Sequence, residues 1–142
     1  MKPRYFQLSL DEKQQAVTSI KNILAAEKEI LFAFIFGSFD DETDNLPFHD
    51  IDVGIYIDGL DKKESLFYSL ELSERLSSVM RMPVDIRVLN FAPISFIFYV
   101  IRGQLIIDKD EDLRCEFMER AASRYLDIKP LVKRSIKEAF AA

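Results

Sequence analysis

The stretch ILFAFIFGS (residues 30–38) and the stretch DIDVGIYI (residues 50–57) decide the fold. The first is apolar on both faces over the length of a strand, which predicts a central strand covered on both sides, and it ends at Gly37 and Ser38. The second alternates, so that its branched apolar side chains point one way while Asp50 and Asp52 point the other. Residues two apart in a strand lie roughly 6.5–7 Å apart at Cα. The two carboxylates are therefore expected to be able to converge on one ion.

A third carboxylate, Asp85, lies within a later apolar run, VDIRVL (84–89), on the same predicted face as Arg87. Burial disfavours an acid in such a strand unless the acid is paired or binds a metal ion. Two interpretations stay open: Asp85 joins Asp50 and Asp52 in a metal site, or it forms a structural ion pair with Arg87 or another basic residue. A D-x-D pattern by itself also fits a solvated strand start, and a Gly-Ser after a strand also fits a simple turn.

The combination of these motifs predicts a site for two metal ions and a phosphate chain. Mg²⁺ prefers oxygen ligands and keeps several waters, so protein sites offer few carboxylates and substrate phosphates supply the rest. Asp50 and Asp52 could bridge both ions, and Asp85 could complete one and accept the proton of an attacking hydroxyl. Gly37 permits close backbone approach, and the N–H and hydroxyl of Ser38 could hold a phosphate.

Helices are predicted between the strands. Ser9 with Glu12, and Asp61 with Glu64, have the capping-box spacing. The apolar residues of the second helix are expected to form its buried side: Leu66, Phe67, Leu70, Leu76, Val79 and Met80. A short helix after Pro93 and an edge strand over 105–107 follow. Strands alternating with helices predict an α+β fold, close to α/β, with a mixed β-sheet flanked by helices.

The C-terminal part is predicted to be helical from Asp110 onward. Leu113, Phe117, Ala121 and Tyr125 form an apolar stripe, and Pro130 is expected to kink or break the helix. After Pro130, an apolar stripe opposite a basic face is expected, formed by Val132, Ile136 and Phe140. We expect one domain over 1–142, with a core over 1–108 and a helical tail over 109–142.

Bulk properties exclude several classes of protein. The chain has 142 residues, nearly half of them apolar, so it can bury a core. Its formal net charge of −5 argues against a general nucleic-acid binder, and its apolar runs are shorter than the roughly 20 residues of a membrane span. We expect no signal peptide. The single cysteine, Cys115, allows no internal disulfide and fits a reducing, cytoplasmic setting. His49, the only histidine, excludes a histidine metal cluster.

Several motifs together resemble one known group of proteins, the minimal nucleotidyltransferases of the polymerase-beta-like superfamily. The short length fits this group, and residues 84–93 and 117–131 resemble its C-terminal half. The motifs of the signature are Gly37-Ser38, Asp50-Ile51-Asp52 and Asp85.

The resemblance implies an Mg²⁺-dependent enzyme with ATP as its substrate. Asp50, Asp52 and Asp85 would then be the catalytic residues and metal ligands, and Gly37 and Ser38 would hold the triphosphate. Minimal nucleotidyltransferases of this type are antitoxins that pair with a HEPN-domain ribonuclease toxin and transfer AMP to one of its tyrosines. The C-terminal helix becomes a candidate docking surface. A homodimer stays open.

The sequence departs from the family pattern just after Ser38. Phe39-Asp40-Asp41 stands where a small residue, an arginine and a glycine are usual, and the spacer to Asp50 is one residue longer. An acidic loop beside a triphosphate is unfavourable unless a cation offsets it. This departure motivates an alternative hypothesis, a nucleotidyltransferase-fold module that neutralises a toxin by binding alone. A third hypothesis is a transferase that acts on a small molecule or an RNA end.

Overall fold

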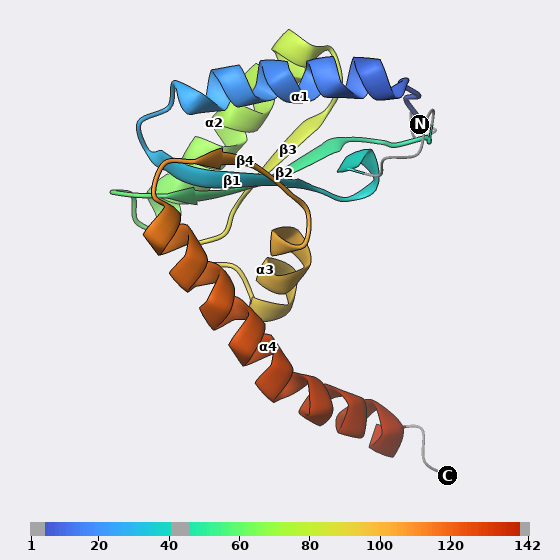
Figure 1. The fold of residues 1–142 in the computed structure, drawn as a ribbon, viewed down its shortest axis with the longest axis vertical. Helices are drawn as coiled ribbons and strands as arrows, with labels where there is room; N and C mark the ends of the chain where they lie inside the picture. Colours follow the sequence, from blue (N-terminus) through green and yellow to red (C-terminus); the bar gives the residue numbers. More distant parts are fainter. Residues whose placement is uncertain (1–4, 41–45, 140–142) are drawn as a thin grey trace.

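The structure is a computed structural model and describes residues 5–40 and 46–139, except for the side chains of residues 132 and 136. Four strands alternate with helices along this part of the chain (Figure 1). The elements in order are α1 (Leu10–Ala25), β1 (Ile30–Phe36), the short 3-10 helix η1 (Ser38–Asp40), β2 (Ile51–Ile57), α2 (Lys62–Met80), β3 (Val84–Val88), α3 (Ile94–Ile101), β4 (Gln104–Asp108) and α4 (Glu111–Ala139).

The sheet has the strand order β3-β2-β1-β4. β1 is antiparallel to both β2 and β4, whereas β2 and β3 are parallel. The sheet is therefore mixed, as the sequence predicted, with β1 in the interior and β4 at an edge. The register places Asp52 opposite Phe36 of β1 on one side and opposite Asp85 of β3 on the other.

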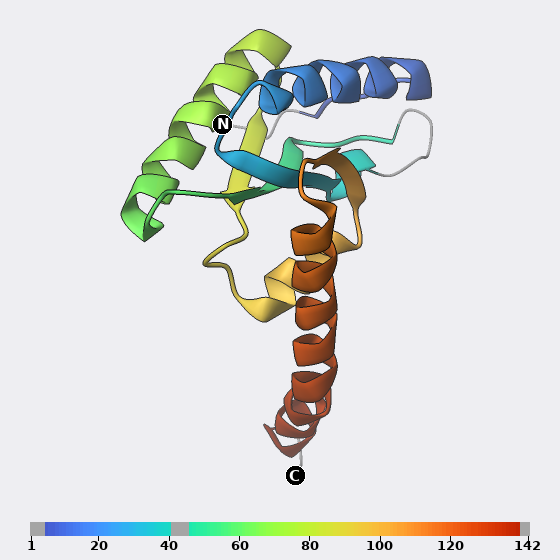
Figure 2. The same ribbon diagram turned by 60° about the vertical axis from the view of Figure 1, so that its left-hand side comes forward.

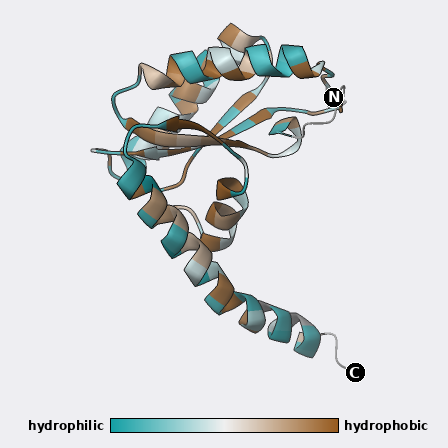
Figure 3. Cartoon of the chain, viewed as in Figure 1, coloured by the Kyte–Doolittle hydropathy of each residue, from teal (hydrophilic) through white to brown (hydrophobic). Residues whose placement is uncertain are grey.

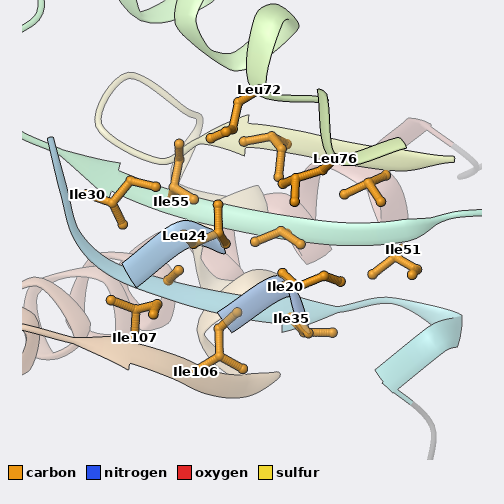
Figure 4. Close-up of a cluster of buried hydrophobic side chains, with 14 of the residues drawn as sticks. Ile20, Leu24, Ile30, Ile35, Ile51, Ile55, Leu72, Leu76, Ile106 and Ile107 are labelled. Carbon is orange, nitrogen blue, oxygen red and sulfur yellow. The ribbon is translucent and has the colours of Figure 1, made fainter. Parts of the chain in front are cut away.

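Helices cover both faces of the sheet, α1 and α2 on one and α3 and α4 on the other (Figure 1). β1 is buried on both faces because Ala33 and Ile35 belong to the first core and Phe32, Phe34 and Phe36 to the second. Figure 4 shows the first core, where side chains of α1 and α2 meet those of the sheet. Figure 3 shows the apolar residues concentrated on the strands and the polar ones on the outer helical faces.

Both predicted capping boxes are confirmed. The Ser9 hydroxyl accepts a hydrogen bond from the Glu12 N–H, and the Glu12 carboxylate accepts one from the Ser9 N–H. Asp61 and Glu64 exchange the same pair of bonds at the start of α2. These side chains satisfy backbone donors that a helix start leaves without partners, so the sequence alone locates both helix starts.

The predicted buried side of α2 is wrong for most of its residues. Leu66, Phe67, Leu70 and Val79 are each 57–62% exposed, whereas Ser65, Ser69, Leu72 and Leu76 are buried. The physical reason is that α2 lies along β3, an edge strand whose outward N–H groups need partners. Ser73 accepts from the Ile86 N–H, and Ser77 accepts from the Val84 N–H. A stripe of serines, 65, 69, 73 and 77, therefore turns toward the sheet.

The predicted apolar stripe on α4 is confirmed, but Pro130 does not break the helix. Phe117 packs against Phe32 and Tyr56, and the Tyr125 ring stacks on Phe98 with centroids 4.0 Å apart. α4 runs through Pro130 without interruption, and its axis bends in its C-terminal part (Figure 1). Pro130 is exposed, so water can bond to the carbonyl that its missing N–H leaves free. The predicted stripe of Val132, Ile136 and Phe140 lies outside the described side chains.

Membrane insertion through a helix finds no support in the described residues. Within residues 5–40 and 46–139, none of the helices combines the length and the hydrophobicity that a membrane span requires.

Candidate active site

The three predicted carboxylates come together at one end of the sheet. Asp50 immediately precedes β2, Asp52 is the second residue of β2, and Asp85 is its partner in the neighbouring strand β3. Because the two strands are parallel and in register, residues 52 and 85 have side chains on the same face. The predicted convergence of the acids thus follows from strand alternation and one register.

The carboxylates lie close enough to share a cation. One oxygen from each of Asp50, Asp52 and Asp85 lies within 4.8 Å of the others, and all three residues are half-buried. Three carboxylate oxygens at this separation are hard ligands of the kind that Mg²⁺ prefers. The residues present therefore fit a divalent metal ion.

The cluster carries an unfavourable concentration of negative charge. The pKa of Asp52 is raised from 3.8 to about 7, first because the carboxyl is partly removed from water and then because Asp50 and Asp85 repel its charge. A hydrogen bond with Asp50 raises the pKa further, and the Arg87 guanidinium lowers it. A bound cation would favour the charged form of all three carboxyls.

Asp85 also forms an ion pair with Arg87. The Arg87 Nε donates to Asp85 Oδ2 at 3.0 Å, and the guanidinium lies 5.8 Å from the centre of the Phe96 ring. The two interpretations of Asp85 are therefore compatible, since the same carboxylate belongs to the acidic cluster and pairs with Arg87. The Arg87 side chain is 59% exposed, so it could reach a bound phosphate.

Gly37 brings the end of β1 against the acidic cluster. Its φ of +83° lies in the left-handed region, and a Cβ at this position would lie 2.6 Å from Asp52 Oδ2. Both the conformation and the close approach require glycine. Ser38 follows as the first residue of η1 and is exposed. The predicted phosphate-binding turn thus lies directly beside the predicted metal ligands.

The unusual residue after Ser38 has a structural role. Phe39 is buried, and its ring packs edge-on against Phe48 with centroids 4.9 Å apart. The turn is thereby fixed to the core by an aromatic side chain. Asp41, Glu42 and Asp44 of the predicted acidic loop lie outside the described residues.

Lys13 is a residue near the site that the sequence interpretation missed. Its side chain is only 5% exposed, and its ammonium lies 5.8 Å from the ring centres of both Phe39 and Phe48. The signal was present in the sequence, because Lys13 precedes Ala16 and Ile20 at the helical spacing of the buried stripe of α1. Its positive charge thus lies beside the ring of Phe39, the residue that follows Ser38.

Two other residues considered from the sequence lie apart from this chemistry. His49 is exposed, and its ring centre lies 3.9 Å from that of Tyr5. Cys115 is a half-buried free thiol on α4. Neither belongs to the group of acids that could hold a metal ion.

Comparisons with known proteins agree with this geometry. Residues 18–112 match the family model described as polymerase beta, nucleotidyltransferase. No relative among curated proteins matches the sequence at a significant level. The matched segment contains both predicted motifs and the third carboxylate.

Solved structures with the same fold include toxin–antitoxin complexes. A chain from the complex of tri-AMPylated Shewanella oneidensis HEPN toxin with MNT antitoxin is 19% identical, with a TM-score of 0.70, covering 91% of this chain and 99% of its own. A chain of the toxin–antitoxin MntA-HepT is 18% identical, with a TM-score of 0.68, covering 90% of this chain and 99% of its own. A third, from a toxin–antitoxin structure with AMP-PNP, is 18% identical, with a TM-score of 0.68, covering 90% of this chain and 98% of its own.

Proposed function

The chain belongs to the polymerase beta nucleotidyltransferase family, and from this premise we propose that it is an antitoxin that transfers AMP from ATP to a tyrosine of a HEPN-domain toxin. One observation carries the proposal. Asp50, Asp52 and Asp85 offer carboxylate oxygens within 4.8 Å of one another. Gly37, whose left-handed conformation favours glycine, brings the predicted phosphate-binding turn against them.

Each residue has a definite role in this proposal. Asp50, Asp52 and Asp85 would hold Mg²⁺, which when bound supplies positive charge to the entering and leaving oxygens of the displacement. The Ser38 hydroxyl and N–H, presented by the Gly37 turn, bind the β- and γ-phosphates. Arg87 draws the α-phosphate toward the cluster.

The transfer itself is an in-line displacement at the α-phosphorus. The tyrosine oxygen forms a bond to this phosphorus, while the bond to the oxygen that bridges the α- and β-phosphates breaks and pyrophosphate leaves. Asp85, at the edge of the cluster, accepts the phenolic proton. The protein accelerates this reaction mostly by orienting the two reactants through the turn and the acids.

The choice of partner rests on the complexes in which chains of the same fold occur. One chain of the same fold occurs in a complex with a tri-AMPylated HEPN toxin, and another in the toxin–antitoxin MntA-HepT. Their identities of 18–19% establish the fold alone, so the HEPN partner is part of the proposal. We place both proteins in the cytoplasm, where the lone thiol of Cys115 would stay reduced.

Labelling tests the proposal directly. The protein, Mg²⁺ and α-labelled ATP are incubated with a HEPN-domain toxin, which is sought first in the neighbouring reading frame, and label is expected on a tyrosine of that toxin. Combined Asp50→Ala and Asp52→Ala changes should abolish the label. Asp58→Ala, which removes an exposed acid just after β2, is the matched control and should leave the label unchanged. Labelling that survives the double change would remove these acids from the mechanism.

A second candidate function is neutralisation by binding alone. It is favoured by Phe39-Asp40-Asp41, because Phe39 is committed to the core and acids follow where the family pattern has an arginine and a glycine. The C-terminal part of α4 extends away from the sheet (Figures 1 and 2), and Leu126 and Leu131 on it are exposed. If cells expressing the double variant at Asp50 and Asp52 still resist the toxin, binding suffices.

A further inference from the structure

A groove of about 770 Å³ lies where α2 passes the free edge of β3. In Figure 2, α2 and β3 lie side by side at the edge of the sheet. The groove reaches both faces of β3, because Ile86 and Val88 line it from one face and Asp85 and Arg87 from the other. Since Asp85 also belongs to the acidic cluster, the groove adjoins the candidate active site.

The groove is lined in part by large apolar side chains that are exposed to solvent. Leu66 and Leu70 of α2 and Phe91 after β3 line it, and they are 57%, 58% and 48% exposed. Such large side chains side by side in a concave region mark a binding surface more often than scattered single exposures do. They are the same α2 residues that the serine stripe displaces from the core.

A buried hydroxyl in the groove has no partner. Ser73 and Ser77 bond to the edge of β3, but one turn further toward the N-terminus Ser69 donates to the Leu66 carbonyl. The next serine, Ser65, is fully buried and lines the groove, and its Oγ has no hydrogen-bond partner within the described residues. A buried polar atom of this kind calls for a ligand or water. The interaction between α2 and β3 thus ends where the groove begins.

The groove is basic although the chain is acidic. Lys62, Lys63 and Arg87 line it with a single carboxylate, Asp85, in a chain whose formal net charge is −5. Lys62 and Lys63 are exposed at the first turn of α2. An occupant with apolar side chains and at least one carboxylate would complement this surface in both respects.

The strand order places the groove opposite the phosphate-binding turn. Gly37 at the end of β1, Asp52 in β2 and Asp85 in β3 lie in sequence across the sheet, and the groove lies beyond Asp85. In an in-line displacement, the attacking group enters on the side opposite the leaving group. A pyrophosphate leaving toward Ser38 therefore requires the acceptor to enter from the groove.

We propose that this groove binds the acceptor segment of the protein substrate, in which the tyrosine is flanked by apolar residues and a carboxylate. The inference rests on the proposed adenylyl transfer. The apolar residues of the segment pack on Leu66, Leu70 and Phe91, and the carboxylate pairs with Lys62 or Lys63. The tyrosine then lies at Asp85, with its oxygen aimed at the α-phosphorus.

A pair of double variants on one helix tests the groove. Leu66→Glu with Leu70→Glu changes the groove, and Phe67→Glu with Val79→Glu changes residues of α2 that are equally exposed but do not line it. Three quantities are measured: the Kd for the HEPN-domain partner without nucleotide, the KM for that partner, and the Kd for ATP with Mg²⁺. The midpoint of urea unfolding is also measured for each variant, to confirm that the variant is folded.

The groove variant is expected to raise the Kd and the KM for the partner by about tenfold or more, as loss of a central apolar contact does. The control should change them by less than about twofold, and the Kd for ATP should stay unchanged in both. Equal effects of the two variants on partner binding would overturn the inference. A weakened affinity for ATP with unchanged partner binding would overturn it as well, because the groove would then bind the nucleotide.

Charge reversal provides an independent arm. Lys62→Glu with Lys63→Glu should weaken partner binding and reduce its salt dependence, whereas Lys21→Glu with Lys28→Glu, two exposed lysines of α1 and the turn after it, should not. The same measurements separate the two proposals. If the wild type binds its partner through the groove but transfers no AMP, adenylyl transfer fails while the docking site stands. If it transfers AMP and the groove variant is as active as the control, the docking site alone fails.

Discussion

Replacing Asp52 with asparagine is expected to stabilise the metal-free protein at neutral and alkaline pH. The Asp52 carboxyl is half-buried and faces Asp50 and Asp85, and its pKa is raised from 3.8 to about 7. Asparagine has nearly the same shape but no charge. The variant therefore removes the desolvation and the repulsion that the native state imposes on this one group, and it can keep a hydrogen bond to Asp50.

The size of the effect follows from the pKa values. A pKa unit corresponds to about 1.4 kcal/mol, so a rise from 3.8 to about 7 amounts to about 4 kcal/mol of destabilisation for a fully shielded group. Asp52 is only half-buried, and solvent screens a large part of its interaction with Asp50 and Asp85. We expect the variant to unfold with a free energy about 2 kcal/mol higher than the wild type at about pH 8.

The pH dependence has a defined sign. Between pH 3.8 and about pH 7 the native state keeps a proton on Asp52 that the unfolded chain has released. Because the native state then binds more protons, the free energy of unfolding falls as the pH rises through this window and levels off above it. The advantage of Asp52→Asn should therefore be small near about pH 4 and reach its full value above about pH 7.

Urea unfolding in the presence of a chelator, followed by circular dichroism at both pH values, measures the difference. Asp58→Asn removes an equal charge from an exposed position and should change the stability by less than about 0.5 kcal/mol. Mg²⁺ should raise the stability of the wild type with the logarithm of its concentration, as RT ln(1 + c/Kd) for a free concentration c, and leave the variant nearly unchanged. An Asp52→Asn variant no more stable than the wild type at about pH 8 would refute the reasoning, since the acids would then not repel one another.

Three further substitutions have expected outcomes. Gly37→Ala should destabilise the protein by about 1–2 kcal/mol and weaken Mg²⁺ binding, because its Cβ meets the Asp52 carboxylate and its φ is left-handed; calorimetric titration with Mg²⁺ measures this. Asp61→Ala should lower the urea-unfolding free energy by about 1 kcal/mol through loss of the cap of α2, with unchanged adenylyl transfer. Ser73→Ala should lower it by about 1–3 kcal/mol, because the Ile86 N–H loses its acceptor, and faster amide exchange at Ile86 would identify the cause.

The acidic cluster could be predicted from the sequence because its geometry depends on short-range rules. Strand alternation alone puts Asp50 and Asp52 on one face, and a single parallel register adds Asp85. The helix starts at Ser9 and Asp61 could be predicted equally well, since a capping box involves residues only three apart.

The orientation of α2 could not be predicted in the same way. Both an apolar stripe and a serine stripe recur at helical spacing, and hydrophobicity alone selects the first. The structure selects the second because β3 is an edge strand whose N–H groups need acceptors, which Ser73 and Ser77 supply. Which strand forms the edge is a property of the whole sheet. The sequence of α2 therefore predicts which of its two stripes faces the sheet only once the strand order is known.

The need of β3 for hydrogen-bond acceptors also links the wrong prediction for α2 to the proposed function. A helix that presented Leu66 and Leu70 to the sheet would bury them and close the surface beside Asp85. Because α2 instead turns serines inward, these leucines stay exposed next to a carboxylate of the candidate active site. The sheet also fixes Asp50, Asp52 and Asp85 near one another against their mutual repulsion, which a cation would relieve. The edge of β3 thus combines a concentration of negative charge, which a bound cation would offset, with an exposed apolar groove, which a docked protein segment would cover. The transfer of AMP to such a segment would use both.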